Sequence, residues 1–148
     1  MWTRAEALAV LAKAPAPALA EALAAALGAA GAPETRDLRS PEIGAVMIRG
    51  RAGATGAVFN LGEMTVTRCS LTLPTGEVGH GYVAGRDADH ARRVALCDAL
   101  LQTPMAERIR AQVLAPLAEA AEAARQATAA RAATTKVDFF TLVRGEDP

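Results

Sequence analysis

Apolar and polar positions divide the chain into helical segments at its two ends and a strand-rich segment between them. In residues 1–31, leucines recur every three or four positions, which is typical of helices that bury one face. The first helix is expected to begin at a capping box, in which Thr3 and Glu6 exchange hydrogen bonds with each other's backbone N–H groups. The second helix carries one apolar stripe, formed by Leu19, Leu23 and Leu27. We therefore predict two N-terminal helices that pack closely.

Between residues 34 and 84 the pattern changes to alternation, which favours β-strands. Ser40-Pro41-Glu42 has the composition of a turn, and Pro74-Thr75-Gly76 is typical of a tight turn inside a hairpin. The strands expected on either side of these turns cover residues 35–39, 43–51, 66–73 and 77–84. The sequence therefore predicts an antiparallel sheet of about four strands within an α+β fold.

The run from Val58 to Leu73 is rich in β-forming residues, but its alternation changes phase. Met64 and Val66 share one face of the expected strand, whereas Cys69 and the leucines that follow it share the other. Either a β-bulge near Arg68 or burial of both faces would explain this change.

The stretch Gly79–Leu101 leads from the last strand into a helix and holds most of the polar candidates. Gly79 and Gly81 lack side chains, so another segment can approach the strand closely at these positions. The other strand face is expected to carry Val78, His80, Tyr82 and Ala84. Asp87 is predicted to cap the helix, because its carboxylate can accept hydrogen bonds from the free N–H groups of the first turn.

One stripe of the helix after Asp87 combines His90 with Val94, Cys97 and Leu101. A histidine on an apolar stripe is more often a packed core residue than a ligand. Arg93 lies within the same arc, where it needs either a carboxylate partner such as Asp89 or a surface shared with another chain.

The helical region is expected to extend over residues 87–133, with a new helix starting at the Thr103 cap and Pro104. Pro116 should kink this helix or split it after Leu114, because proline removes a backbone donor. Residues 118–133 are mostly alanine with scattered charges, so this part either leans along the domain or is a solvated spacer.

The last segment, residues 136–145, is apolar on both sides if it is extended. Its large apolar residues are Phe139, Phe140, Leu142 and Val143. Two interpretations remain open: the segment folds onto its own domain, or it is an arm inserted into a partner.

The length of 148 residues predicts one domain, residues 1–148, but aromatic residues make up only 3% of it. Much of the apolar content is alanine, so the core should be thin and an oligomer or complex is expected. A net charge of zero argues against broad binding to nucleic acid or an anionic membrane. No apolar run is long enough to span a bilayer, and Cys69 and Cys97 have no metal or redox spacing. The cytoplasm is the default location.

Catalytic and metal motifs are not found in the sequence: no nucleophile has a neighbouring base at motif level. His80 and His90 could serve as acid–base groups, and Arg86 with Asp87 could orient a phosphate. Structural roles are the simpler interpretation for both histidines, and Asp87 is explained as a helix cap that Arg86 can pair with. The glycine-containing loop Gly53–Gly56 lacks the lysine of a phosphate-binding loop and is a weaker anion candidate.

Four motifs in order give a more specific indication: LGE followed by VTRC at residues 61–69, YVAGRDADHA at 82–91, ALCDALLQ at 95–102 and VDFF at 137–140. With these motifs the chain resembles the PhnG family of the phosphonate C–P lyase system. The resemblance is close over residues 53–102 and returns at 137–145.

This resemblance implies a non-catalytic but required subunit of a complex with PhnH, PhnI and PhnJ, which acts functionally with PhnL. The complex transfers the ribose triphosphate part of ATP to methylphosphonate and releases adenine, giving alpha-D-ribose 1-methylphosphonate 5-triphosphate. The resemblance also implies that PhnI carries out this chemistry and that PhnJ holds the iron–sulfur cluster, so this subunit should bind no cofactor. The expected partner contacts are Arg93 and the arm Phe139–Val143. The alternatives are direct phosphate binding by Arg86, His80 or His90, and a homo-oligomeric module that binds a small anion.

Overall fold

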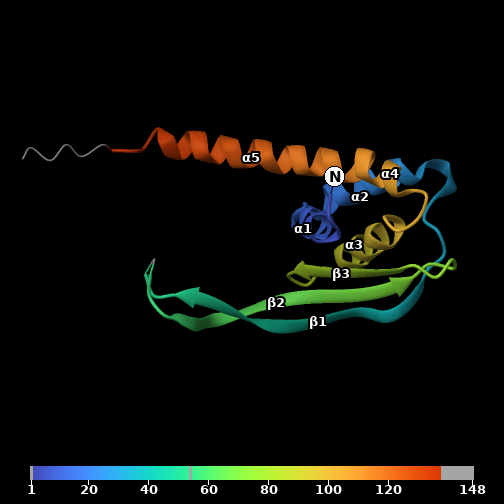
Figure 1. Ribbon diagram of the computed structural model, residues 1–148, viewed down its shortest axis with the longest axis horizontal. Helices are drawn as coiled ribbons and strands as arrows, with labels where there is room; N and C mark the ends of the chain where they lie inside the picture. The colour runs from blue at the N-terminus through green and yellow to red at the C-terminus, as the bar shows by residue number, and fades with distance from the viewer. Residues whose placement is uncertain (1, 54, 138–148) are drawn as a thin grey trace, which may run out of the picture.

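The computed structural model describes residues 2–53 and 55–137 of the chain. It has an α+β fold in which helices cover one face of a three-stranded antiparallel sheet (Figure 1). The first two helices are α1, Arg4–Lys13, and α2, Ala16–Leu27. The predicted capping box at Thr3 is present, and the leucine stripe of α2 is buried. A short 3₁₀ turn, Gly28–Ala30, follows α2.

The sheet has three strands in the order β1-β2-β3 instead of the four that the sequence suggested. They are β1, Arg36–Arg51, β2, Val58–Thr72, and β3, Val78–Ala84. The expected turn at Ser40-Pro41-Glu42 was wrong, because β1 runs through it with an irregular register between Arg39 and Glu42. Proline is tolerated there because β1 is an edge strand and a bulge absorbs the missing donor. The predicted β2–β3 hairpin is confirmed.

The phase change in the long second strand is also explained by the structure. Val66 and Thr67 are adjacent and both are buried, so the two faces of β2 are covered at this point. The bulge lies in the neighbouring strand: Arg39 pairs with Ser70, and the next pair joins Glu42 to Arg68. Burial of both faces was one of the two explanations that the sequence left open.

Helix α3, Ala88–Leu100, packs directly on the sheet because β3 presents glycines to it. A Cβ atom at Gly79 would lie 1.8 Å from the carbonyl oxygen of Ala95, and one at Gly81 would lie 1.9 Å from that of Ala91. Both are far closer than any side chain allows. The close approach predicted at these glycines is therefore an approach by the helix that follows them.

After α3 the chain forms α4, Ala106–Ile109, a π-helical turn, Arg110–Leu114, and the long helix α5, Ala115–Ala133. The helix begins two residues later than the sequence suggested, at Ala106 instead of Pro104, although the Thr103 hydroxyl still accepts from the N–H of Met105. The predicted disturbance before Pro116 takes the form of the π-helical turn.

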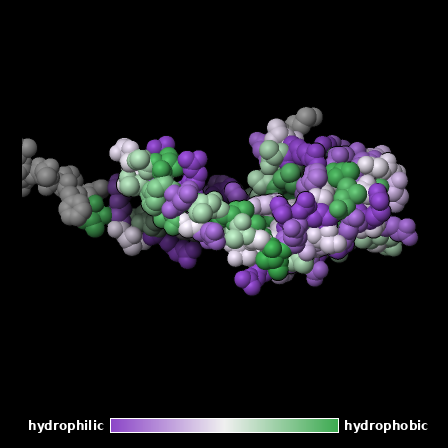
Figure 2. Space-filling model, turned by 90° about the horizontal axis from the view of Figure 1, so that it is seen from below, coloured by the Kyte–Doolittle hydropathy of each residue, from purple (hydrophilic) through white to green (hydrophobic). Residues whose placement is uncertain are grey.

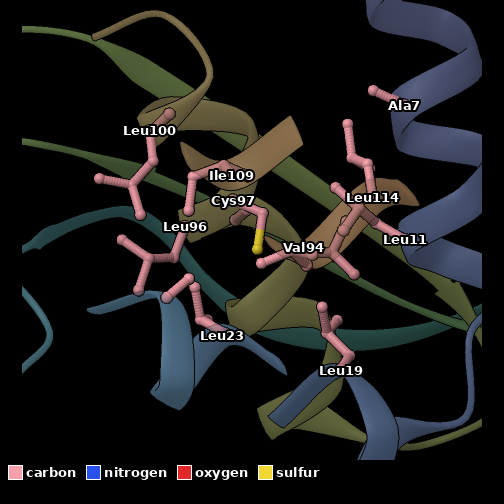
Figure 3. Close-up of a cluster of buried hydrophobic side chains, with 14 of the residues drawn as sticks. Ala7, Leu11, Leu19, Leu23, Val94, Leu96, Cys97, Leu100, Ile109 and Leu114 are labelled. Atoms are coloured by element: carbon pink, nitrogen blue, oxygen red, sulfur yellow. The ribbon is translucent and has the colours of Figure 1, made fainter. Parts of the chain in front are cut away.

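The hydrophobic core lies where α1, α2, α3 and the π-helical turn meet above the sheet (Figure 3). Its large side chains include Leu11, Leu19, Leu23, Val94, Leu96, Leu100, Ile109 and Leu114. Trp2 packs against this cluster from the N-terminus, beside Leu117 at the start of α5. None of the helices within residues 2–53 and 55–137 combines the length and apolar character that crossing a membrane requires.

Two elements extend beyond this core on the same side of the molecule (Figure 1). The first is the distal ribbon, which we define as residues 43–51 of β1 and 58–65 of β2. Beyond the pair of Gly44 with Val66 the ribbon is two-stranded, because β3 stops pairing with β2 at Val66. The second is α5, in which Leu117 is the last buried residue; no residue from 118 to 137 is buried. The alanine-rich part of the chain is therefore a solvated helix, one of the two predicted alternatives.

Candidate functional site

The junction between β3 and α3 is built by local hydrogen bonds. Gly85 has a φ of 90°, which favours glycine, and its N–H donates to the carbonyl oxygen of Thr65 at 2.8 Å. The Thr67 hydroxyl donates to the carbonyl oxygen of Gly85 at 2.8 Å. Asp87 is the helix cap that the sequence predicted, since its carboxylate accepts from the N–H of His90 at 2.8 Å. The junction is thus fixed in one geometry.

The three candidate ligand residues do not converge around this junction. The His90 ring is buried, and its Nε2 lies 3.1 Å from the carbonyl oxygen of Leu11, so it joins α3 to α1. His80 is exposed on the sheet face that α3 does not cover, with its Nδ1 at 2.9 Å from the Ser70 hydroxyl. Arg86 is exposed and makes no side-chain hydrogen bond or ion pair within the described residues. Ligand binding by these residues stays a prediction.

A buried carboxylate that sequence reasoning missed holds α1, β3 and α3 together. Asp98 is 1% exposed, and its two oxygens accept from Nε and Nη2 of Arg4, both at 2.8 Å. The same carboxylate accepts from the backbone N–H of His80 at 2.8 Å. An aspartate within the apolar run from Ala95 to Leu101 was the available signal, because such a charge requires partners.

A second ion pair ties α3 to the edge of the sheet. Both terminal nitrogens of Arg92 donate to the carboxylate of Asp37 at 2.8 Å, and this bidentate contact raises the arginine pKa. The sequence pointed instead to Arg93 with Asp89 as its partner. Arg93 is half-buried and forms no ion pair within the described part of the chain, so its predicted partner contact is untested.

The two cysteines belong to the hydrophobic core. Both are buried and free. Burial raises the pKa of the Cys97 thiol to about 12. Burial also raises the pKa of Cys69, which lies near Arg92 and Asp37. Within residues 2–53 and 55–137, no three His, Cys, Asp or Glu side chains are placed to share a metal ion.

The distal ribbon is the most unusual surface of the molecule because its exposed side chains are large and apolar. Figure 2, seen from the sheet side, shows hydrophobic residues on this projecting part. The exposed apolar side chains of the ribbon are Ile43, Met47, Ile48, Val58, Phe59, Leu61 and Met64. These strands were predictable from the β-forming residues of the sequence, but the absence of a cover within the described residues was not.

Both faces of the ribbon are apolar. Val46, Met47 and Ile48 follow one another in β1, so alternate faces receive them. In the register with β2, Val46 faces Met64 and Met47 faces Glu63. The loop at the ribbon's tip includes Ala54, which lies outside the described residues. A partner that covered one face alone would leave the other in water.

An apolar groove of about 910 Å³ lies at the opposite end of the molecule, between the end of α2, the β2–β3 turn and the α3–α4 connection. Leu27, Leu73, Leu100 and Met105 line it, and Glu107 and Arg108 lie at its border. It carries no convergent set of polar groups, so it is a second surface of apolar character and not a catalytic cleft.

A family model described as phosphonate metabolism protein PhnG matches residues 2–145. The chain belongs to this family. Among curated proteins, it is 47% identical over 119 residues to the alpha-D-ribose 1-methylphosphonate 5-triphosphate synthase subunit PhnG of Rhizobium meliloti (strain 1021). That match covers 78% of this chain and 74% of the relative. The resemblance found in the motifs is thereby confirmed, and the PhnG match includes the whole distal ribbon and the segment that follows α5.

The predicted interface residues of the arm, from Phe139 to Val143, lie outside the described residues. The other half of that prediction, the partner contact through Arg93 on α3, stays a prediction. Helix α3 is enclosed by the chain's own sheet and helices along most of its length, so it offers little free surface to a partner.

Proposed function

We propose that this PhnG chain is a non-catalytic but required subunit of the bacterial complex that makes alpha-D-ribose 1-methylphosphonate 5-triphosphate. It acts with PhnI, PhnH and PhnL in the cytoplasm, where the ribose triphosphate of ATP is transferred to methylphosphonate and adenine is released. Its partners in the hetero-oligomer are PhnI, PhnH and PhnJ, and it binds no cofactor of its own. The name of the relative, a synthase subunit, supports this assignment. The observation that carries it is the distal ribbon.

The ribbon is unsuited to remain in water. A two-stranded hairpin without a covering layer is marginally stable at best. Phe59 and Leu61 are 45% and 65% exposed, although each would bury a large apolar area in an interface. Phenylalanine and methionine are also enriched at protein interfaces. The ribbon therefore has the composition and shape of an element that a larger partner encloses.

The buried and capping polar residues of the chain stabilise its fold, which agrees with the role of a non-catalytic subunit. Asp87 caps the N-terminus of α3, and the His90 ring forms a hydrogen bond with the carbonyl oxygen of Leu11. Asp98 and Asp37 fix Arg4 and Arg92 between elements. These contacts make a rigid base from which the ribbon projects.

Co-purification with the partner subunits tests the proposal. The chain is co-expressed with PhnI, PhnH and PhnJ, and Phe59→Ser is combined with Leu61→Ser in the ribbon. We expect the co-purified partners to fall by roughly tenfold or more, because the variant removes buried anchor side chains from the interface. The matched control is Leu38→Ser: this leucine is 50% exposed on β1 but lies outside the ribbon. Normal co-purification of the ribbon variant would contradict the proposal.

A second experiment separates assembly from chemistry. The complex is reconstituted with Arg86→Ala or His80→Ala, and synthase turnover is measured at full occupancy of the subunit. For a non-catalytic subunit, turnover per assembled complex stays at the wild-type value. Reduced turnover with normal assembly would instead favour the alternative, in which Arg86 or His80 contacts a phosphate group in a shared site.

A further inference from the structure

The outer edge of β1 in the distal ribbon is open and carries no protection against strand pairing. The sheet order leaves β1 with a neighbour on one side only. Natural edge strands are protected by charges, prolines or bulges. In β1 the proline and two irregularities of register lie at the core end, and a third irregularity lies between Ile48 and Arg49, at the far end of the run Ile43–Ile48. Residues 43–48, Ile-Gly-Ala-Val-Met-Ile, have neither charge nor proline.

The charges at the two ends of this open edge limit which strand fits it. Glu42 precedes Ile43, and Arg49 follows Ile48. Arg49 forms no ion pair within the described residues. An added strand should therefore be apolar in the middle, with an acidic residue at the end that meets Arg49.

The chain itself contains a segment with this pattern. Residues 138–144 read Asp-Phe-Phe-Thr-Leu-Val-Arg, an apolar and β-prone run with one charge at each end. In an antiparallel alignment Asp138 lies opposite Arg49, and Arg144 lies opposite Ile43, one residue from Glu42. A parallel alignment would bring Asp138 to Glu42 and Arg144 towards Arg49, which places like charges together. The charge order thus selects the antiparallel direction.

A second copy has to supply this segment, because the chain's own segment is too far away. Helix α5 packs on α1, and α1 packs on α3 and β3, so one helix layer separates α5 from the sheet (Figure 1). Two layer spacings amount to roughly 20 Å. The N–H of Lys136 still bonds to the carbonyl oxygen of Ala133, so the chain remains at the helix end there. The two residues from Lys136 to Asp138 span about 7 Å when extended.

We propose that the edge of β1 over Ile43–Ile48 binds the C-terminal segment of a second copy of this chain as an antiparallel strand, with Asp138 of that copy opposite Arg49. The added strand completes the backbone hydrogen bonds of the edge and brings two phenylalanines beside the apolar ribbon. Reciprocal exchange between two copies gives a symmetric dimer in which each copy provides one edge and one segment. This contact goes beyond the proposed function, because it joins copies of the chain and not different subunits.

The mass of the isolated full-length chain, measured by light scattering after gel filtration, is the first test. The wild-type chain should be a dimer, and the chain ending at Lys136 should be a monomer with an unchanged unfolding midpoint. Arg49→Asp and Asp138→Arg should each weaken dimerisation roughly tenfold, and the double variant should restore it, because the charges are exchanged. Arg36→Asp is the control: Arg36 is exposed on the same strand but outside the pairing register. A wild-type chain that stays monomeric would overturn the proposal.

Disulfide cross-linking tests the proposed strand register and whether the added strand comes from a second copy of the chain. One tagged chain carries Val46→Cys and ends at Lys136, and a differently tagged chain carries Thr141→Cys. A disulfide should join the two tags, because residues 46 and 141 are directly opposite in the proposed register. Leu142→Cys in place of Thr141→Cys should cross-link poorly, since neighbouring strand residues point to opposite faces. Equal cross-linking at both positions, or none, would contradict the register. Loss of this contact with normal co-purification of PhnI would leave the proposed function intact.

Discussion

Strand β2 passes through two environments, and the contrast between them explains the shape of the molecule. From Val66 to Thr72 the strand pairs with β3, and α3 covers one of its faces. From Val58 to Thr65 the same strand has a single neighbour and no cover within the described residues. Both halves carry large apolar side chains. The difference lies in what the rest of the chain brings to each half, namely a helix for one and nothing for the other.

The covered half depends on contacts between distant residues. The glycines of β3 let α3 lie against the sheet, and Asp98 and Asp37 then bind arginines from α1 and α3. The distal ribbon has no comparable contacts within the described residues. Paired substitutions in the two halves should therefore have very different effects on the free energy of unfolding.

The largest difference is expected for Gly81→Ala against Gly62→Ala. The new Cβ at residue 81 would lie 1.9 Å from the carbonyl oxygen of Ala91, so α3 must move away from the sheet. We expect a loss of about 4 kcal/mol in the free energy of unfolding, or failure to fold. At Gly62 a Cβ meets no atom within 4 Å, and the variant should behave as wild type. Urea unfolding followed by circular dichroism measures both, and equal effects would show that α3 does not depend on these glycines.

Two leucines in β2 give the next comparison. Leu71 is 0% exposed and Leu61 is 65% exposed. Leu71→Ala should lower the free energy of unfolding by about 3 kcal/mol through lost burial and a cavity. Leu61→Ala, made in the chain ending at Lys136, should change it by less than about 0.5 kcal/mol, because that chain is expected to be a monomer. A large effect at Leu61 in this monomer would mean that the chain itself covers the ribbon.

A buried carboxylate of the core and an exposed one on α5 should differ as well. Asp98→Asn leaves one amide oxygen to serve three donors, so a loss of about 2 kcal/mol is expected. Glu122 pairs with Arg125 on the solvated face of α5, and Glu122→Gln should leave the unfolding midpoint unchanged. Thermal unfolding of the two variants, measured side by side, makes this comparison. A stable Asp98→Asn protein would indicate that Arg4 and His80 find other partners.

The smallest effect concerns alkaline pH. Burial raises the pKa of Cys97 from 9.0 to about 12, so the unfolded chain releases this proton at lower pH than the folded chain. The stabilisation is complete below pH 9.0 and is lost as the pH rises towards about 12. The slope should reach at most about 1.4 kcal/mol per pH unit. Between about pH 8 and about pH 10, Cys97→Ala should weaken this dependence in urea titrations, and an unchanged slope would assign it to other groups.

Local features of the fold were predictable from the sequence. The capping box at Thr3, the Asp87 cap and the β2–β3 turn each depend on residues close together in the chain. The family could be identified from motifs that span the strand-to-helix junction. The turn predicted at Pro41 was wrong because an edge strand tolerates proline, and the position of a strand at the edge is a property of the whole sheet.

Contacts between distant residues could not be predicted in the same way. Arg4 and Asp98 are 94 residues apart, and Asp37 and Arg92 are 55 apart. The choice of Arg92 over Arg93 depends on which side of α3 faces β1, which one sequence does not reveal. The exposure of the ribbon was equally hidden, because alternation shows which residues share a face but not whether that face has a neighbour.

The position of Trp2 gives the molecule an internal optical reporter. It is the single tryptophan of the chain, and it lies beside Leu117, where α5 leaves the core. Its emission therefore depends on how the base of that helix is seated, and hardly at all on the distant ribbon. A partner that displaces α5 from the core should shift the emission maximum of Trp2 to longer wavelength. A partner that binds the ribbon alone should leave the emission spectrum unchanged.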